Sequence, residues 1–297
     1  WAGAAIAIAI WTPNLIWNAH HHWAALAMLH SLHQENSSLG ASIGFIPAQL
    51  IVVGPALFPC WFGGLRQLLR HPFGRPLGLA SITLAILYAA TGAKPYYLGG
   101  IYFVLFAAGG VRIEQRLATT HRSPRRYVWL FVVGAVVALP LTLPVLPVGA
   151  LAKGPWEGNI NKDLSATVGW KPFVGQIAGI VASLQPSQRA QVVIFTGDYG
   201  AAGAVDRYGA SFGLPRATSG HNSYWWWGPT SATDGATTIA VNLSRTYLDT
   251  IFGEVVRAGS VETPNNIWSE ERGDPIWICR NQKIRWSSVW PAAKHYG

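Results

Sequence analysis

Acidic side chains are nearly missing from the first half of this 297-residue chain. Residues 1–149 hold only Glu35 and Glu114, and the other acids lie in residues 150–297. This shortage excludes a pair of carboxylates for general acid and base catalysis in the first half. Charged residues make up 12% of the chain and hydrophobic residues 50%, which is typical of a membrane protein that carries a soluble part. We expect a membrane domain over residues 1–149 and a small α/β domain over residues 150–297.

Cysteine and methionine are also scarce, with two Cys and one Met. Cys60 and Cys279 show neither metal-ligand nor redox spacing, and the expected topology places them where they cannot pair. The chain begins at Trp1, inside an apolar run that ends at Trp11. As a helix this run measures only ~16 Å, about half of a bilayer core. We therefore expect earlier membrane segments to precede Trp1 in the natural protein.

The formal net charge of +9 is concentrated in two loops. The arginines of these loops are Arg66, Arg70 and Arg75 in one and Arg112, Arg116, Arg122, Arg125 and Arg126 in the other. A nucleic-acid-binding protein would carry its basic residues on a folded domain, so we expect no nucleic-acid partner. Arginine-rich loops instead mark the cytoplasmic side of membrane proteins. The histidine segment, Lys94 and residues 150–297 are then expected on the other side.

Long apolar runs predict an α-helical polytopic membrane bundle with five segments, the first incomplete. The segments cover about 1–12, 43–65, 77–93, 98–111 and 127–148. Prolines in the second segment free backbone carbonyls, so we expect this helix to pack inside the bundle. The fourth segment contains glycines that permit close helix contact, namely Gly99, Gly100, Gly109 and Gly110.

Residues 150–297 alternate between strand and helix patterns. Strands are expected over 191–196, 237–243, 254–261 and 275–280. Helices are expected over 172–184, 201–208 and 244–252, the last with Ser244 as its N-cap. This alternation predicts a small α/β domain with a mainly parallel sheet.

Lys94 lies between two apolar runs and is followed by Pro95, Tyr96 and Tyr97. Structurally, it could be a snorkelling anchor within an aromatic belt. Alternatively, its ammonium group and the two phenols could meet the phosphate of a lipid.

Two loops of the second half carry unusual residues. The loop at 196–203 (Thr-Gly-Asp-Tyr-Gly-Ala-Ala-Gly) follows a strand and opens a helix, which is typical of either a tight turn or a phosphate-binding loop. It places Asp198 at the carboxyl edge of the sheet, where open α/β domains bind ligands. The loop at 220–229 contains His221, Asn222, Tyr224, Trp225, Trp226 and Trp227. These rings could stack on sugars, or they could pack the domain onto a membrane surface.

Histidines cluster near the N-terminus at positions 20–22, 30 and 33. His30 and His33 share a helical face, and together with Glu35 they could ligate a divalent metal. Histidine runs at membrane interfaces are also simply polar surface. No cofactor is certain from the sequence.

Three segments together resemble glycosyltransferase family 39, whose bacterial members are similar to dolichyl-phosphate-mannose–protein mannosyltransferases of the GT-C superfamily. They are Pro13-Asn-Leu-Ile-Trp-Asn-Ala-His-His-His-Trp23, the proline-rich helix with Gly54-Pro55, and Gly92-Ala-Lys-Pro-Tyr-Tyr-Leu98. The likeness covers roughly residues 1–150. Residues 150–297 resemble the outer C-terminal domain of one bacterial subgroup.

The resemblance implies an enzyme of the bacterial plasma membrane that moves a sugar from a polyprenyl-phosphate carrier to a glycan, lipid or protein acceptor. In the family a carboxylate in the first outer loop is the catalytic base, so no catalytic base is expected in this chain. Lys94, Tyr96 and Tyr97 match the segment near the donor phosphate. His21 and Trp23 match a loop at the mouth of the active site.

Two other function classes fit the same residues. One is a non-catalytic, membrane-anchored module that binds glycans or organises an envelope complex. The other is a lipid-linked transporter, which would also use an intramembrane cation.

Overall fold

The computed structural model describes residues 1–36, 39–121, 123–143, 147–151, 165–229 and 231–296. The chain divides into two compact units, Trp1–Pro140 and Leu141–Gly297. The boundary falls shortly before the one expected at residue 149. Each unit is described by itself.

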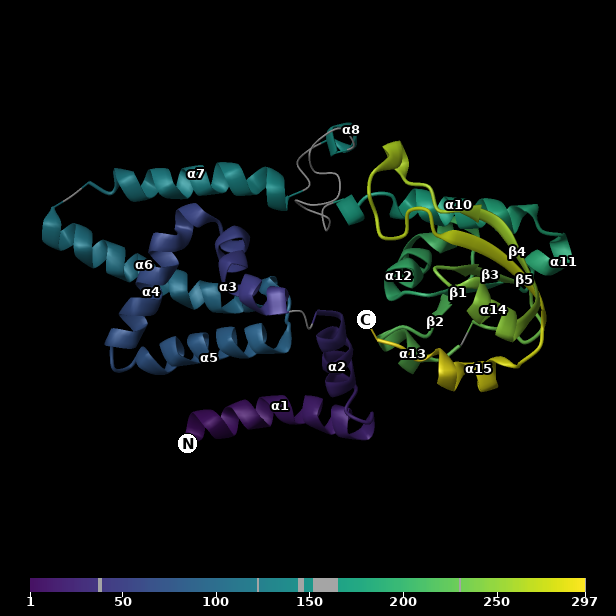
Figure 1. The fold of residues 1–297 in the computed structure, drawn as a ribbon, viewed down its shortest axis with the longest axis horizontal. Coiled ribbons are helices and arrows are strands. Elements are labelled where there is room, and N and C mark those ends of the chain that lie inside the picture. Colours follow the sequence, from purple (N-terminus) through teal and green to yellow (C-terminus); the bar gives the residue numbers. More distant parts are fainter. Residues whose placement is uncertain (37–38, 122, 144–146, 152–164, 230, 297) are drawn as a thin grey trace. The chain divides into compact units, whose positions relative to one another are not determined.

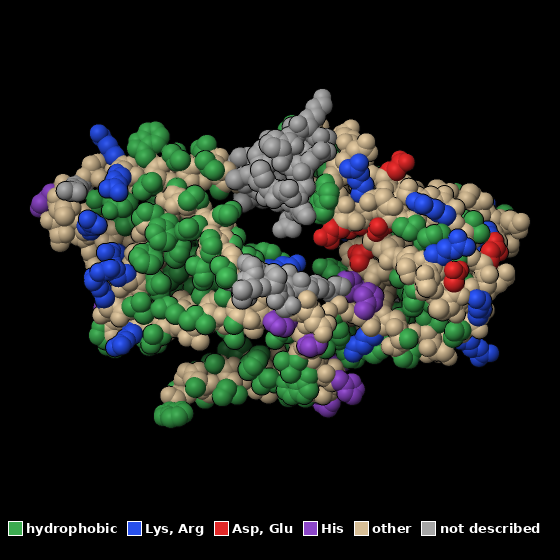
Figure 2. All heavy atoms as spheres, viewed as in Figure 1, with side chains coloured by type: hydrophobic (Ala, Val, Ile, Leu, Met, Phe, Trp, Pro, Cys, Tyr) green, Lys and Arg blue, Asp and Glu red, His purple; other side chains and the backbone are tan. Residues whose placement is uncertain are grey.

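The first unit is built from helices (Figure 1). They are α1 (Ala2–His20), α2 (Ala24–Asn36), α3 (Leu39–Val53), η1 (Pro55–Leu57), α4 (Phe58–Arg70), α5 (Arg75–Thr91), η2 (Pro95–Leu98), α6 (Gly99–Thr120) and α7 (Arg125–Thr142). Its buried core is small and centres on Phe45, Leu98, Tyr102 and Leu105. Hydrophobic side chains cover much of the visible surface of this unit (Figure 2), and Phe103 in the first half of α6 is 80% exposed.

One helix among the described residues, Pro95–Thr120, is long and apolar enough to span a membrane. The predicted polytopic bundle is therefore wrong. Of the other expected segments, α5 has only 17 residues, and the run at 43–65 passes the same test only if two sharply bent pieces count as one span. In the second expected segment, the sequence pattern joined two apolar runs that the backbone divides.

The division of the second expected segment occurs at Gly54. The pieces Ile43–Val53 and Pro55–Arg70 are bent by 88° relative to each other. Gly54 has a φ of 88°, a left-handed conformation that glycine adopts at little cost. Pro55 follows it, and the residue before a proline avoids helical geometry. Glycine and proline together therefore end one helix and start another.

Helices α4 and α6 touch through their backbones. A Cβ placed on Gly64 would lie 1.9 Å from the carbonyl oxygen of Leu105, and one on Gly109 would lie 2.2 Å from that of Cys60. Gly109 thus confirms the expected close helix contact. Gly99, Gly100 and Gly110 meet nothing within 4 Å and make no such contact.

The second unit is an α/β domain with a five-stranded sheet in the order β2-β1-β3-β5-β4. Its strands are β1 (Val193–Thr196), β2 (Ala217–Ser219), β3 (Thr238–Val241), β4 (Phe252–Ser260) and β5 (Pro275–Gln282). β1 pairs in parallel with β2 and β3, whereas β5 runs antiparallel to both β3 and β4. The sheet is mixed, so the prediction of a mainly parallel sheet is wrong. The sequence did not indicate β2, which is only three residues long.

Helices cover both faces of this sheet (Figure 1). On one face lie α10 (Trp170–Ser183) and α12 (Tyr199–Tyr208), which pack with Ile194 and Ile239. On the other face lie α14 (Arg245–Ile251) and α15 (Trp286–Ala293), which pack with Phe195 and Trp277. Successive strand residues point to opposite faces. The short helices α8 (Val148–Leu151), α11 (Pro186–Arg189) and α13 (Ser223–Trp227) complete the domain.

Candidate functional site

Lys94 lies at the start of the helix that could span a membrane. Gly92 ends α5 with a left-handed φ of 70°, and Lys94 is the N-cap of η2, which leads into α6. A cavity of about 250 Å³ opens beside it, lined by Leu29, Leu32, Tyr88, Thr91, Gly92, Ala93, Lys94 and Tyr97. The lining combines one ammonium group and two phenols with apolar side chains. Such a cavity can accept a phosphate attached to a hydrocarbon chain.

The structure brings two of the three predicted phosphate-binding residues to this cavity. Tyr97 packs edge-on against Tyr88, with ring centroids 6.3 Å apart. Tyr96 contacts the ring of Tyr97 but does not line the cavity, and 50% of its surface is exposed.

A buried polar network fixes the backbone next to Lys94. The Gln49 side-chain amide donates to the carbonyl oxygens of Phe45 and Pro95 at 3.1 and 3.2 Å. The Tyr102 hydroxyl donates to Gln49 Oε1 at 2.9 Å. Neither Gln49 nor Tyr102 was expected from the sequence. A lone glutamine inside an apolar run was the available indication, because a buried amide needs partners.

His21 and Trp23 lie at the turn between α1 and α2. The His21 ring stacks on Trp17 with centroids 4.1 Å apart, and its Nδ1 lies 2.6 Å from the Trp17 carbonyl oxygen. Trp23 has a φ of 56° and is 47% exposed. Neither residue lines the cavity beside Lys94, so a role at the mouth of an active site stays a prediction.

The proposed metal ligands were His30, His33 and Glu35. His30 Nε2 lies 3.0 Å from the Gln34 amide, and His33 Nδ1 lies 3.2 Å from the Thr91 carbonyl oxygen. The Glu35 side chain lies outside the described residues. Within the part of the chain that the structure describes, no group of three or more His, Cys, Asp or Glu could hold a metal ion.

In the second unit, polar residues meet where β1 and β3 end. Because β2 and β3 lie on opposite sides of β1, the strand order reverses here, and open α/β sheets bind ligands at such points. The Asp198 carboxylate accepts from the Ala201 N–H at 2.7 Å and from the Asn242 amide at 2.7 Å. Burial raises the pKa of Asp198, although hydrogen bonds from Ala201 and Gly200 oppose the shift. The loop at 196–203 is thus a tight strand-to-helix turn closed by its own carboxylate.

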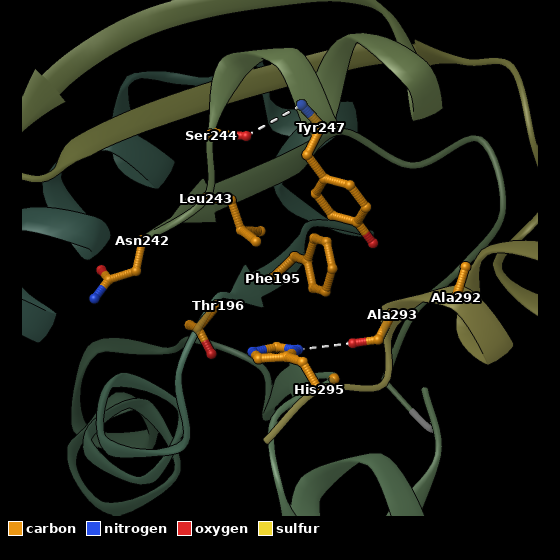
Figure 3. A pocket seen from close by; sticks show the side chains of 10 residues that line it. Phe195, Thr196, Asn242, Leu243, Ser244, Tyr247, Ala292, Ala293 and His295 are labelled. Atoms are coloured by element: carbon orange, nitrogen blue, oxygen red, sulfur yellow. Dashed lines mark hydrogen bonds between the residues drawn. The ribbon is translucent and has the colours of Figure 1, made fainter. Parts of the chain in front are cut away.

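A second cavity of about 250 Å³ lies at this sheet edge (Figure 3). Its lining includes Thr196, Asn242, Tyr247 and His295. Among the described residues, Asn242 Oδ1 and the Tyr247 hydroxyl are buried without a hydrogen-bond partner. Buried polar atoms are usually paired, so these two atoms are available to a small ligand with hydroxyl groups.

His295 reaches this edge from the C-terminal segment. Its Nε2 lies 2.8 Å from the Gly197 carbonyl oxygen and its Nδ1 lies 2.8 Å from that of Ala293. The ring stacks on His221 with centroids 4.6 Å apart. Burial, and then the charge of His295, lower the pKa of His221 to about 4.

The three consecutive tryptophans have different environments. Trp225 and Trp290 exchange hydrogen bonds between indole N–H groups and carbonyl oxygens at 2.8 and 3.0 Å. The Lys294 ammonium lies over the rings of Trp225 and Trp226, 4.4 and 4.2 Å from their centroids. Asn222 donates its backbone N–H to the His295 carbonyl oxygen. These contacts attach the C-terminal segment to the sheet edge.

Trp227 instead faces outward and is 58% exposed. It lines a groove of about 330 Å³ with Asp206, Arg216 and Tyr224. The Asp206 carboxylate accepts from Arg216 at 3.1 Å, from the Ala217 N–H at 2.8 Å and from the Tyr224 hydroxyl at 3.2 Å. Burial, and then the charge of Asp206, raise the pKa of Tyr224 to about 12, so this phenol stays a donor. Asp206 and Arg216 were not expected from the sequence.

No protein-family model matches this chain, and neither a curated protein nor a solved structure matches it.

Proposed function

We propose that this chain belongs to a membrane glycosyltransferase that moves a sugar from a polyprenyl-phosphate donor to an acceptor, as the resemblance to glycosyltransferase family 39 implies. The observation that carries the proposal is the cavity beside Lys94, at the start of the helix that could span a membrane. The position suits a lipid phosphate at the membrane surface. Arg112 and Arg116 lie at the other end of α6, and by the positive-inside rule this supports a Lys94 end outside the cytoplasm.

In this reaction an acceptor hydroxyl oxygen forms a bond to the anomeric carbon of the sugar. The bond from that carbon to the phosphate oxygen breaks, and the phosphate keeps the electron pair. The acceptor proton passes to a base, which in the family is a carboxylate of the first outer loop. Lys94 would hold the phosphate and stabilise the charge that develops on it, and such stabilisation is strong where water is excluded.

The proposal is tested by sugar transfer in membranes that contain the protein. Decaprenyl-phosphate donors bearing mannose, glucose or arabinose serve as substrates. We expect Lys94→Gln to reduce turnover about 10²-fold, as losing one electrostatic contact to the leaving group typically does. Lys94→Arg keeps the charge and should retain most activity, and Lys171→Gln is the matched control outside the first unit. Equal turnover by the Lys94→Gln variant and the parent would refute the assigned role.

A second candidate function, carbohydrate binding without catalysis, is favoured by the groove at Trp227. An exposed indole face beside a carboxylate, a guanidinium group and a phenol offers stacking and hydrogen bonds together. A membrane surface suits this groove less, because the Asp206 carboxylate would face lipid phosphates. Binding of tetrasaccharides such as mannotetraose, followed by saturation-transfer NMR, should be lost in Trp227→Ala. The variant Phe212→Ala, which removes another exposed ring of this unit, should bind normally.

A further inference from the structure

Four arginines of the first unit line one cavity of about 450 Å³. Arg66 comes from α4, Arg112 and Arg116 from α6, and Arg126 from α7. No ion pair between described residues involves any of the four. Glu114 lies between Arg112 and Arg116 in sequence but does not line the cavity. The cavity therefore concentrates positive charge on its walls.

Close packing of α4 and α6 forms one side of this cavity. Gly109, which touches the backbone at Cys60, is part of the lining. Gly63, also in the lining, lies beside the Arg112 side chain, and a Cβ at this position would make an ordinary contact of 3.4 Å with Arg112 Cδ. Arg112 and Arg116 are four residues apart and so project from one face of α6. The positive-inside rule explains why arginines occur in this region, but it does not explain why their side chains line one cavity.

The rest of the lining is largely apolar and includes Phe62, Ile113, Leu117 and Leu130. The hydroxyl-bearing residues Thr120, Ser123 and Tyr127 also line it. Arg116 lies near the end of the helix that begins at Pro95, about 30 Å along the helix axis. That length matches the hydrocarbon thickness of a bilayer, so a membrane span over this helix would put the cavity at headgroup depth on the side opposite Lys94. Figure 2 shows Lys and Arg side chains gathered at this end of the unit.

We propose that this cavity binds the phosphate of an anionic membrane lipid on the cytoplasmic side, with the acyl chains along the apolar residues. Guanidinium groups bind phosphate oxygens in a bidentate manner, and clusters of basic residues at the cytoplasmic end of a membrane-spanning helix bind anionic headgroups. A lipid fits better than a free phosphate ion because apolar side chains form part of the wall. This site is separate from the cavity at Lys94 and does not depend on the proposed sugar transfer.

The test uses the purified protein in a neutral detergent, with lipid adducts counted by native mass spectrometry. Dioleoylphosphatidylglycerol is titrated beside dioleoylphosphatidylcholine. We expect the anionic lipid to bind at least tenfold more tightly than the zwitterionic one. Each arginine near an anionic headgroup contributes about fivefold, so Arg112→Gln with Arg116→Gln should weaken phosphatidylglycerol binding about 25-fold. Inorganic phosphate at the same concentration as the lipid should not compete.

The matched control is the pair Arg70→Gln with Arg75→Gln. It removes the same charge from the same region, but neither residue lines the cavity, so binding should fall no more than about twofold. The double variant Arg112→Lys with Arg116→Lys keeps both charges, so it should bind phosphatidylglycerol better than the glutamine pair does. This comparison distinguishes loss of the site from unfolding. Equal losses in the Arg70/Arg75 and Arg112/Arg116 glutamine pairs would overturn the proposal. So would equal binding of both lipids, competition by inorganic phosphate, or a lysine pair as weak as the glutamine pair.

Discussion

Two adjacent glycines of α6 should respond in opposite ways to the same substitution. In Gly109→Ala, the new Cβ would lie 2.2 Å from the Cys60 carbonyl oxygen, whereas ordinary contacts begin at 3.4 Å. Helices α4 and α6 would have to separate by about 1 Å, and overpacking of this kind typically costs about 1–3 kcal/mol. In Gly110→Ala, nothing lies within 4 Å, so the variant gains up to about 1 kcal/mol of helix propensity.

The packing can be followed through the thiol of Cys60, which is buried against Gly109. We expect maleimide to modify Cys60 at least about fivefold faster in Gly109→Ala than in the parent, because 1.4 kcal/mol changes an opening equilibrium tenfold. In Gly110→Ala the rate should be unchanged or slower. Cys279 is buried in the second unit and serves as the internal reference. If both variants label Cys60 at the parent rate, α4 and α6 do not pack as described.

Two further predictions concern the C-terminal segment of the second unit. The pKa of His221 in the folded protein, about 4, is below the ordinary value of 6.5, so protonation favours unfolding and stability should fall as the pH drops from 6.5 towards 4. The free energy of unfolding should fall by up to about 3 kcal/mol over this pH range. In His221→Gln, urea titrations should show a free energy of unfolding that changes less with pH. An equal pH dependence in the variant and the parent would contradict the lowered pKa of His221. Lys294→Met removes the cation over Trp225 and Trp226 and should lower the free energy of unfolding by about 0.5–2 kcal/mol. Lys171→Met, which removes an exposed lysine outside this cluster, should cost less. The free energies of unfolding of the two variants are compared by following the near-UV circular dichroism of the indoles.

Local chemistry in the second unit could be predicted from the sequence. The hydroxyl of Ser244 accepts from the Tyr247 N–H at 3.2 Å, as its position before a helix indicated. The turn after β1 also follows from its residues, because glycine and aspartate suit a tight strand-to-helix connection. Such features depend on neighbours in the sequence. The mixed sheet does not, because the antiparallel placement of β5 beside β3 depends on tertiary packing.

The sequence does not predict which residues far apart in the chain come together in the fold. The arginines of two loops were recognised as a topological feature, but only the packing of α4 against α6 shows that Arg66 and Arg112 line the same cavity. Similarly, the sequence of the loop at 220–229 does not indicate that the Trp225 ring contacts the Lys294 ammonium group while Trp227 is exposed. The second expected segment was predicted as one helix for a related reason, since a hydropathy pattern does not show the bend at Gly54.

The central claim is that Lys94 holds a lipid phosphate, and a direct binding measurement tests it. Undecaprenyl phosphate is titrated into the purified protein, and the bound fraction is measured by native mass spectrometry. A hydrogen bond to a charged group is worth about 1.5–3 kcal/mol, so Lys94→Gln should bind roughly 10–100-fold more weakly, while Lys94→Arg should stay close to the parent. Unchanged affinity in the Lys94→Gln variant would contradict the account.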